Sequence, residues 1–191
     1  MLPMEILVSV GLLVAVLAWV VSVYNRLYHL RREVLGAWKQ WVQATRSRNE
    51  QLGDFADVFA RVLPQGSLVP SRLRSLADDS DRRLRSMEEP RWGNSGESFM
   101  PGAEWMLQRA LRESMDEAER MPQMHTHLEF QQLCGLMSMA LYQQEHRTRL
   151  FNRAAQEYNS ALVSPGGRAL AAVLGFRPSG SLEAPPGENG G

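Results

Sequence analysis

Residues Ile6–Val23 read ILVSVGLLVAVLAWVVSV, a run of 18 positions without a charged side chain. As an α-helix this run is about 27 Å long, close to the roughly 30 Å hydrocarbon core of a bilayer. A cleaved signal peptide is disfavoured because no Lys or Arg precedes the run and no small-x-small cleavage site follows it. A buried core helix is disfavoured because it has no need to avoid charge over so many positions. The run therefore predicts a single membrane anchor, marked by Ile6, Leu12, Val16, Trp19 and Val23.

The charges on either side of this run predict the orientation of the chain. No Lys or Arg lies before the run, whereas residues 24–50 carry six basic side chains against two acidic ones. The positive-inside rule then places the N-terminus outside and the following segment in the cytoplasm. The six basic side chains are Arg26, Arg31, Arg32, Lys39, Arg46 and Arg48. They could contact anionic lipid headgroups or form the solvated face of a helix, and the sequence is compatible with both.

Beyond the run, apolar side chains repeat every seven residues from Tyr24 to Val62. A repeat of this length is typical of a helix packed along a bundle seam, as in a coiled coil. A polar layer at Thr45 and Arg48 interrupts the repeat. Because no proline lies between Met4 and Leu63, the anchor and the first bundle helix are predicted to be continuous. The seam positions are Tyr24/Leu27, Trp38/Trp41, Leu52/Phe55 and Phe59/Val62, with Val34 opposite Arg31.

Three further helices are expected at about residues 71–87, 103–120 and 122–162. The last repeats the heptad and has its own polar layer at Gln144/Arg147, a device that often fixes helix register. The predicted fold is all-α: an N-terminal single transmembrane helix followed by an antiparallel long-helix bundle of about four helices. We divide the chain into a membrane anchor (1–23), a helical bundle (24–163), and a short amphipathic segment with a disordered tail (164–191).

The turn-rich connection at residues 89–102 carries two aromatic residues, Trp92 and Phe99. Loop aromatics either fold back onto the end of a bundle or present a tip to a partner, and folding back is the commoner outcome. Exposed tryptophans at positions 38 and 41 would favour an interaction module, since aromatic anchors dominate interface energy. The candidate partner surface is this loop and the basic face beside the anchor: Trp92, Phe99, Arg31 and Arg32.

Composition argues against several kinds of chemistry. The chain has 21 basic and 21 acidic side chains and a pI near 6.9, so no nucleic-acid partner is expected. Cys134 is the only cysteine, which excludes an intrachain disulfide. His125 and His127 point about 200° apart on a helix and cannot chelate one metal ion together. The acidic run at 78–81 is expected to be a solvated face rather than a cation site, since it lacks the glycine and distant Glu of an EF-hand loop.

No phosphate-binding loop, nucleophile elbow, zinc-protease motif or dinucleotide fingerprint is present. We therefore expect no catalytic residues, no metal and no cofactor. A protein that works by binding is the remaining interpretation.

Three stretches of the chain follow one another in a distinctive order. The first is YNRLYHLRREVLGAW, residues 24–38; the second begins at Pro122; the third is FNRAAQEYNSALVSPGGRALAAVLGFRP, residues 151–178. In this order they resemble the LemA family of bacterial membrane-anchored proteins. The matching positions are Asn25, Leu27, Leu30, Arg31, Val34, Ala37, Trp38, Met124, Phe130, Leu133, Asn152, Tyr158, Asn159, Pro165, Gly166, Gly175, Phe176 and Pro178.

The resemblance covers roughly half of the chain and implies a long-helix bundle beside one membrane span in a bacterial inner membrane. It implies no activity, because the family has no established catalytic residues. Its members often accompany membrane peptidases and other envelope proteins. The chain departs from the family pattern where Val42 replaces an acidic residue, Gly53 replaces a proline, and Leu141-Tyr142-Gln143 replaces a Glu-Asn-Arg run.

The sequence thus predicts a membrane-anchored helical interaction or scaffold protein without catalytic activity of its own. Its expected partners are the lipid bilayer and a membrane or cytoplasmic protein. The alternatives are a self-assembling structural membrane protein and a regulatory subunit of an envelope peptidase. Self-association through the span is suggested by Gly11, Ala15 and Ala18, small residues that share one helix face.

Overall fold

The computed structural model describes residues 4–62, 67–87, 90, 92–93, 102–122 and 127–182. Within these ranges the secondary structure is helical and no β-strand is present. The predicted class is therefore confirmed: an all-α chain in which one long apolar N-terminal helix leads into a helical bundle. The helices are α1 (Met4–Val62), α2 (Val69–Arg85), α3 (Gly102–Glu119), α4 (Leu128–Val163) and α5 (Pro165–Leu174).

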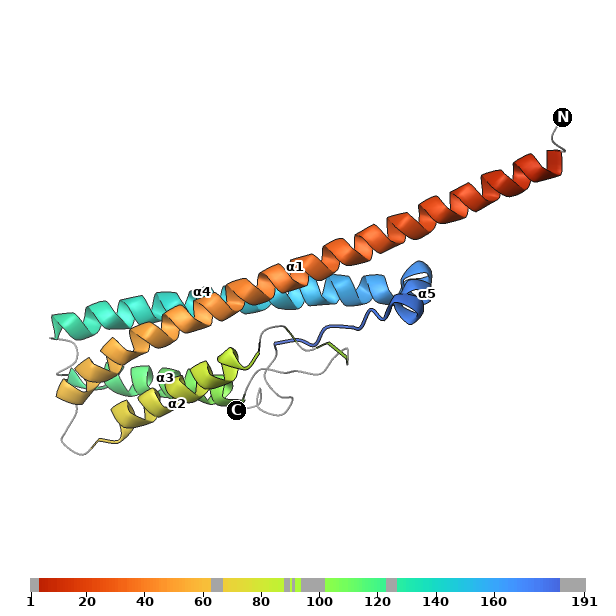
Figure 1. Ribbon diagram of the computed structural model, residues 1–191. Helices are drawn as coiled ribbons and strands as arrows, with labels where there is room; N and C mark the ends of the chain where they lie inside the picture. The colour runs from red at the N-terminus through yellow and green to blue at the C-terminus, as the bar shows by residue number, and fades with distance from the viewer. Residues whose placement is uncertain are drawn as a thin grey trace.

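α1 is one unbroken helix of 59 residues, as the absence of proline predicted. Its N-terminal part carries the apolar run and projects beyond the bundle (Figure 1). Of the predicted anchor residues, Ile6, Leu12, Val16 and Trp19 are exposed, and Val23 is half-buried against the bundle. By length and composition this part of α1 is sufficient to cross a membrane, and its most apolar window is not buried anywhere in the structure.

The bundle is built on α1 and α4, which lie antiparallel along each other (Figure 1). α2 packs on α1 and α3 packs on α2, so the two shorter helices thicken the end of the bundle far from the apolar run. Burial follows the predicted heptads closely. Buried seam residues include Leu27, Val34, Trp38, Trp41, Leu52, Phe55 and Phe59 on α1, and Phe130, Met137, Phe151 and Tyr158 on α4.

The apolar core consists of two clusters. The proximal core, next to the apolar run, contains Leu27, Val34, Trp38, Trp41, Leu84, Phe151 and Tyr158. The distal core contains Leu52, Phe55, Phe59, Leu73, Leu107, Phe130 and Met137. The predicted polar layers, Thr45/Arg48 on α1 and Gln144/Arg147 on α4, fall between the two clusters in sequence. Thr45, Arg48 and Gln144 are buried, whereas Arg147 is half-buried and donates to Gln40 at 2.7 Å on the surface.

α4 ends where Ser164 caps a new helix. The Ser164 hydroxyl accepts a hydrogen bond from the Gly167 amide at 3.2 Å, and Pro165 supplies the first helical position of α5. α5 in turn ends at Gly175, whose φ of 71° is a left-handed conformation that glycine adopts without strain. The predicted short segment after the bundle is therefore a distinct, capped helix.

The prediction of a disordered tail directly after this segment is wrong for residues 177–182. This stretch returns along the bundle: Asn159 on α4 exchanges two 2.8 Å hydrogen bonds with the backbone of Ser179. Asn152 accepts from the Leu182 amide at 2.7 Å, and the Leu182 side chain is buried in the proximal core. The stretch has the composition of a linker, but side chains on α4 satisfy its backbone groups and hold it in place. We call it the return segment; residues 183–191 lie outside the described part.

Candidate functional site

A buried polar cluster lies where α1, α2, α3 and α4 meet. Arg48 and Glu104 form its centre, with both side chains fully buried. The Arg48 guanidinium donates to both carboxylate oxygens of Glu104, from Nη1 at 2.5 Å and from Nη2 at 2.8 Å. This two-point geometry is the strongest form of an ion pair between side chains. The pair ties α1 to the first turn of α3 across the middle of the bundle.

The remaining polar atoms of the cluster are also satisfied. Gln144 on α4 accepts from Arg48 at 2.6 Å and donates to Glu104 at 2.5 Å. Ser80 on α2 donates to Glu104 at 2.8 Å, and Asn49 accepts from Arg48 Nη2 at 2.5 Å. Among the described residues no buried side-chain nitrogen or oxygen lacks a hydrogen-bond partner. Such complete pairing of buried polar atoms is typical of a cluster that stabilises and specifies the fold.

The acidic run on α2 is divided between the surface and this cluster. Asp78 is exposed, and Asp79 pairs with Arg83 on the next turn at 3.0 Å. Asp81, in contrast, accepts a 2.7 Å hydrogen bond from the Asn49 amide at the edge of the cluster. The expectation that the whole run is a solvated face is therefore wrong for Asp81. No grouping of three potential metal ligands occurs in the described ranges.

Two opposing effects act on the pKa of Glu104. Burial raises it, but the Arg48 charge and the hydrogen bonds from Arg48, Gln144 and Ser80 together outweigh burial, so the pKa lies below its usual value of 4.5. A carboxyl group with a lowered folded-state pKa stabilises the fold above its unfolded-state pKa. That contribution is lost as the pH falls through the folded-state pKa.

We therefore expect the free energy of unfolding to decrease as the pH is lowered below about 4.5, with part of this loss due to Glu104. Urea unfolding followed by circular dichroism at a series of pH values measures the effect. The Glu104→Gln variant, which has no carboxyl to protonate, should show a shallower acid dependence. An identical acid dependence in both proteins would contradict this assignment.

The predicted partner surface is partly engaged within the chain. Trp92 folds back onto the bundle, where its ring meets the edge of Tyr158 at a centroid distance of 5.7 Å. The Arg31 guanidinium lies 4.8 Å from the centroid of the same indole, a cation–π arrangement. Arg32 is exposed, whereas Phe99 lies outside the described residues. The structure thus brings Arg31 and Trp92 together. Both are engaged in contacts within the chain, with each other and with the bundle.

The tryptophan pair of α1 is part of the core. Trp38 and Trp41 are both buried and stack with a centroid distance of 5.0 Å. The indole nitrogen of Trp41 donates to the Thr148 hydroxyl on α4 at 3.1 Å. Neither side chain is available as an exposed anchor, so the pair gives no support to an interaction surface.

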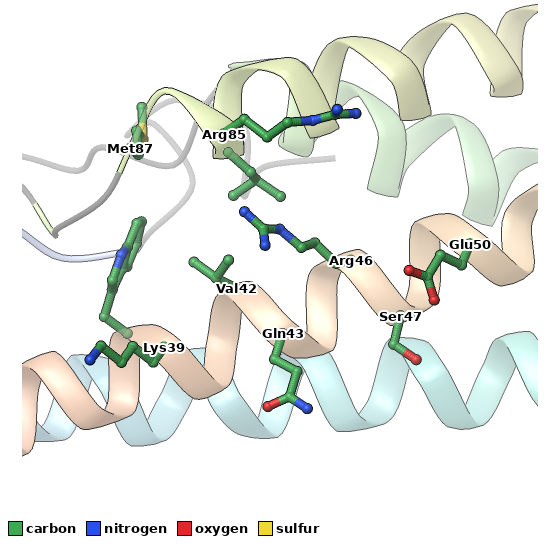
Figure 2. A pocket seen from close by; sticks show the side chains of 10 residues that line it. Lys39, Val42, Gln43, Arg46, Ser47, Glu50, Arg85 and Met87 are labelled. Atoms are coloured by element: carbon green, nitrogen blue, oxygen red, sulfur yellow. The ribbon is translucent and has the colours of Figure 1, made fainter.

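An open groove lies between α1 and the end of α2 (Figure 2). It encloses about 550 Å³, and its apolar floor is formed by Trp38, Val42 and Leu84. Exposed basic side chains from both helices line it: Lys39 and Arg46 on α1 and Arg85 on α2. In Figure 2, Arg46 extends from α1 into the space facing Arg85, and Glu50 lies farther along α1. We call this feature the basic groove.

The basic groove was not predicted, because its two walls are about forty residues apart in the sequence. Val42, one of the departures from the LemA pattern, lines it. Leu141 packs half-buried against the distal core, and Gly53 has open space beside its Cα.

The sequence also did not predict Glu104 as part of the buried polar cluster. The two predicted polar layers implied a buried counter-charge, but nothing in the sequence distinguished this Glu from others on α3.

The chain was compared with protein-family models, curated proteins and solved structures, and none of them matched. The resemblance to the LemA family therefore stays a prediction, based on residues 24–38, 122–133 and 151–178. Several of the positions that carry it have clear structural roles here. Asn159, for example, holds the return segment, while the Tyr158 hydroxyl donates to the Arg177 carbonyl at 3.0 Å.

Proposed function

We propose that this chain is a membrane-anchored helical interaction protein of the LemA type, with no catalytic activity of its own. One observation carries the proposal: a single helix, α1, is apolar and fully exposed over its first part and forms the core of a bundle over the rest. An exposed apolar surface of this length is unfavourable in water and favourable in a bilayer. Since no helix break separates the two parts, the bundle is held directly against the membrane.

The non-catalytic role rests on the state of the polar residues. Arg48 and Glu104 form an ion pair in which both side chains are fully buried. The basic groove is lined by basic side chains together with Ser47 and Glu50, and no group of three potential metal ligands occurs among the described residues. Its apolar floor and basic rim instead suit an acidic partner segment with apolar side chains.

The orientation that we propose places the N-terminus outside a bacterial inner membrane and the bundle in the cytoplasm. It is supported by the basic residues that follow the span, Arg26, Arg31 and Arg32, and by the absence of Lys and Arg before it. Reporter fusions at both ends test this orientation. A C-terminal reporter that is active only outside the cytoplasm would overturn it.

Reversing the charge of the groove should release the partner. In crosslinked native membranes, we expect the Arg46→Glu, Arg85→Glu double variant to recover roughly tenfold less of a specific protein partner, which corresponds to about 1.4 kcal/mol of binding free energy. Affinity purification read by mass spectrometry measures this recovery. The side chains are exposed, so the fold should tolerate both changes.

The matched control is Arg72→Glu with Arg112→Glu, two exposed arginines outside the groove on α2 and α3. Equal loss of the partner in both double variants would show that net charge, not the groove, determines binding. Recovery of this chain alone, with no second protein, would instead favour the self-assembling alternative. A specific partner that proves to be a membrane peptidase would identify the regulatory role implied by the family.

A further inference from the structure

The short helix α5 lies beside the last turns of the apolar run. Gly166 at its start packs so tightly on α1 that an added Cβ would lie 2.8 Å from the Trp19 ring and 3.1 Å from Val23. At the other end, the ring of Phe176 meets Tyr24 edge-on at a centroid distance of 6.2 Å. Figure 1 shows α5 at the end of the bundle from which the N-terminal part of α1 projects. α5 is therefore level with residues 19–24 of α1.

This level coincides with the edge of a bilayer if α1 spans it. The apolar run ends at Val23. The headgroup layer extends about 5–8 Å beyond the hydrocarbon core, which is about four residues of helix. A helix packed beside residues 19–24 must then lie at the boundary between acyl chains and headgroups.

The outer face of α5 is apolar. Its inner face, with Gly166, Gly167 and Leu170, is buried on the bundle. The residues left outside include Val173, which is 80% exposed, and Leu174, which is 50% exposed; Val163 at the end of α4 is 61% exposed. Packing within the chain accounts for only one side of this helix, so the other side has an apolar surface without a partner in the described structure.

The charged side chains on α5 and in the segments directly flanking it are basic. No Asp or Glu occurs from Tyr158 to Leu182, nor from Ile6 to Arg32. Arg26, Arg168 and Arg177 are exposed near this end of the bundle. Apolar side chains flanked by arginines, with no acidic residue between them, are typical of a surface that lies on anionic lipid.

We infer that α5 is an interfacial helix that inserts Val173 and Leu174 into the headgroup boundary of an anionic bilayer and so fixes the height of the bundle above the membrane. The inference rests on the proposed membrane span, because only that span places α5 at the bilayer edge. Lipid is the occupant that fits both the level of the helix, beside residues 19–24, and its basic charge.

The test uses the full-length chain in a Cys134→Ser background, reconstituted in phosphatidylcholine vesicles with and without phosphatidylglycerol. Single cysteines replace Val173 on α5, Leu12 in the span, or Met139 on α4. Each is labelled with a polarity-sensitive fluorophore and quenched by lipids that carry a spin label at a shallow or a deep position. We expect the label at 173 to shift to the blue and to lose intensity with shallow quenchers. The label at 12 should respond to deep quenchers, and the label at 139 to neither.

The three positions separate the possible failures. A label at 173 that behaves like the one at 139, while the label at 12 is quenched deeply, would overturn the interfacial helix and leave the membrane span intact. Absence of quenching at position 12 as well would overturn both. A blue shift at 173 without lipid quenching would show that protein, not lipid, covers this face, and would also overturn the inference.

The charge requirement has its own test in the same vesicles. The Arg168→Glu, Arg177→Glu double variant should lose the phosphatidylglycerol-dependent part of the quenching at 173. Quenching that is independent of phosphatidylglycerol in both proteins would overturn the anionic preference.

Discussion

Replacing Glu104 by alanine is expected to destabilise the fold by about 3–5 kcal/mol, because it leaves the Arg48 guanidinium buried without its counter-charge. Arg48 is fully buried and donates to Glu104 through two nitrogen atoms. Gln144 and Ser80 would also lose an acceptor. Urea unfolding of the full-length chain in detergent, followed by circular dichroism, measures the change in the free energy of unfolding.

The matched control is Glu157→Ala on α4, which removes the carboxylate of the exposed Arg153–Glu157 pair. Exposed pairs of this kind contribute about 0–1 kcal/mol. The Arg48→Met, Glu104→Leu double variant removes both charges together and should recover much of the stability lost in Glu104→Ala. If Glu104→Ala lowered the free energy of unfolding no more than Glu157→Ala does, the cluster would not be the structural centre that its geometry indicates.

Replacing Leu12 by arginine is expected to release the chain from membranes or to prevent its insertion. Leu12 is in the middle of the apolar run, and a central arginine raises the insertion free energy of a span by about 2.5–3.5 kcal/mol. Fractionation of cells, with alkaline extraction of the membranes, measures the share of the chain that stays integrated. The bundle should still fold, since Leu12 lies outside both core clusters.

Met139→Arg provides a closely matched control. Leu12 is 67% exposed and Met139 is 62% exposed, so in the structure alone the two positions look alike. Only the bilayer distinguishes them. Equal membrane integration of both variants would contradict the proposed span, whereas loss in Leu12→Arg alone would support it.

The fold was largely predictable from periodicity. On α1 and α4 the heptad pattern continues over many turns, so each seam position reinforces the assignment of the next, and residues such as Val34 and Phe151 are buried as expected. Tyr24 is an exception, because the bundle ends near it and the ring lies exposed beside Tyr28 and Phe176.

The features that depend on tertiary contacts between segments far apart in the sequence were not predictable. The heptad pattern predicts polar layers at Arg48 and Gln144, but the choice of Glu104 as their partner depends on how α3 packs into the bundle. The return segment has the composition of a tail, and only the spacing of Asn152 and Asn159 on α4 turns it into ordered structure. The basic groove likewise exists only once α2 has packed on α1.

If α1 spans a bilayer as we propose, its unbroken course couples the tilt of the span to the position of the whole bundle. From Val23 to Val62 the helix extends about 58 Å, so its far end lies well away from the point where the chain leaves the apolar run. Spanning helices tilt by about 20° on average, and tilt increases where the bilayer is thin. Without a hinge, such a tilt would swing the far end of the bundle sideways by about 20 Å. A change in bilayer thickness would thereby alter which neighbours the distal helices can reach.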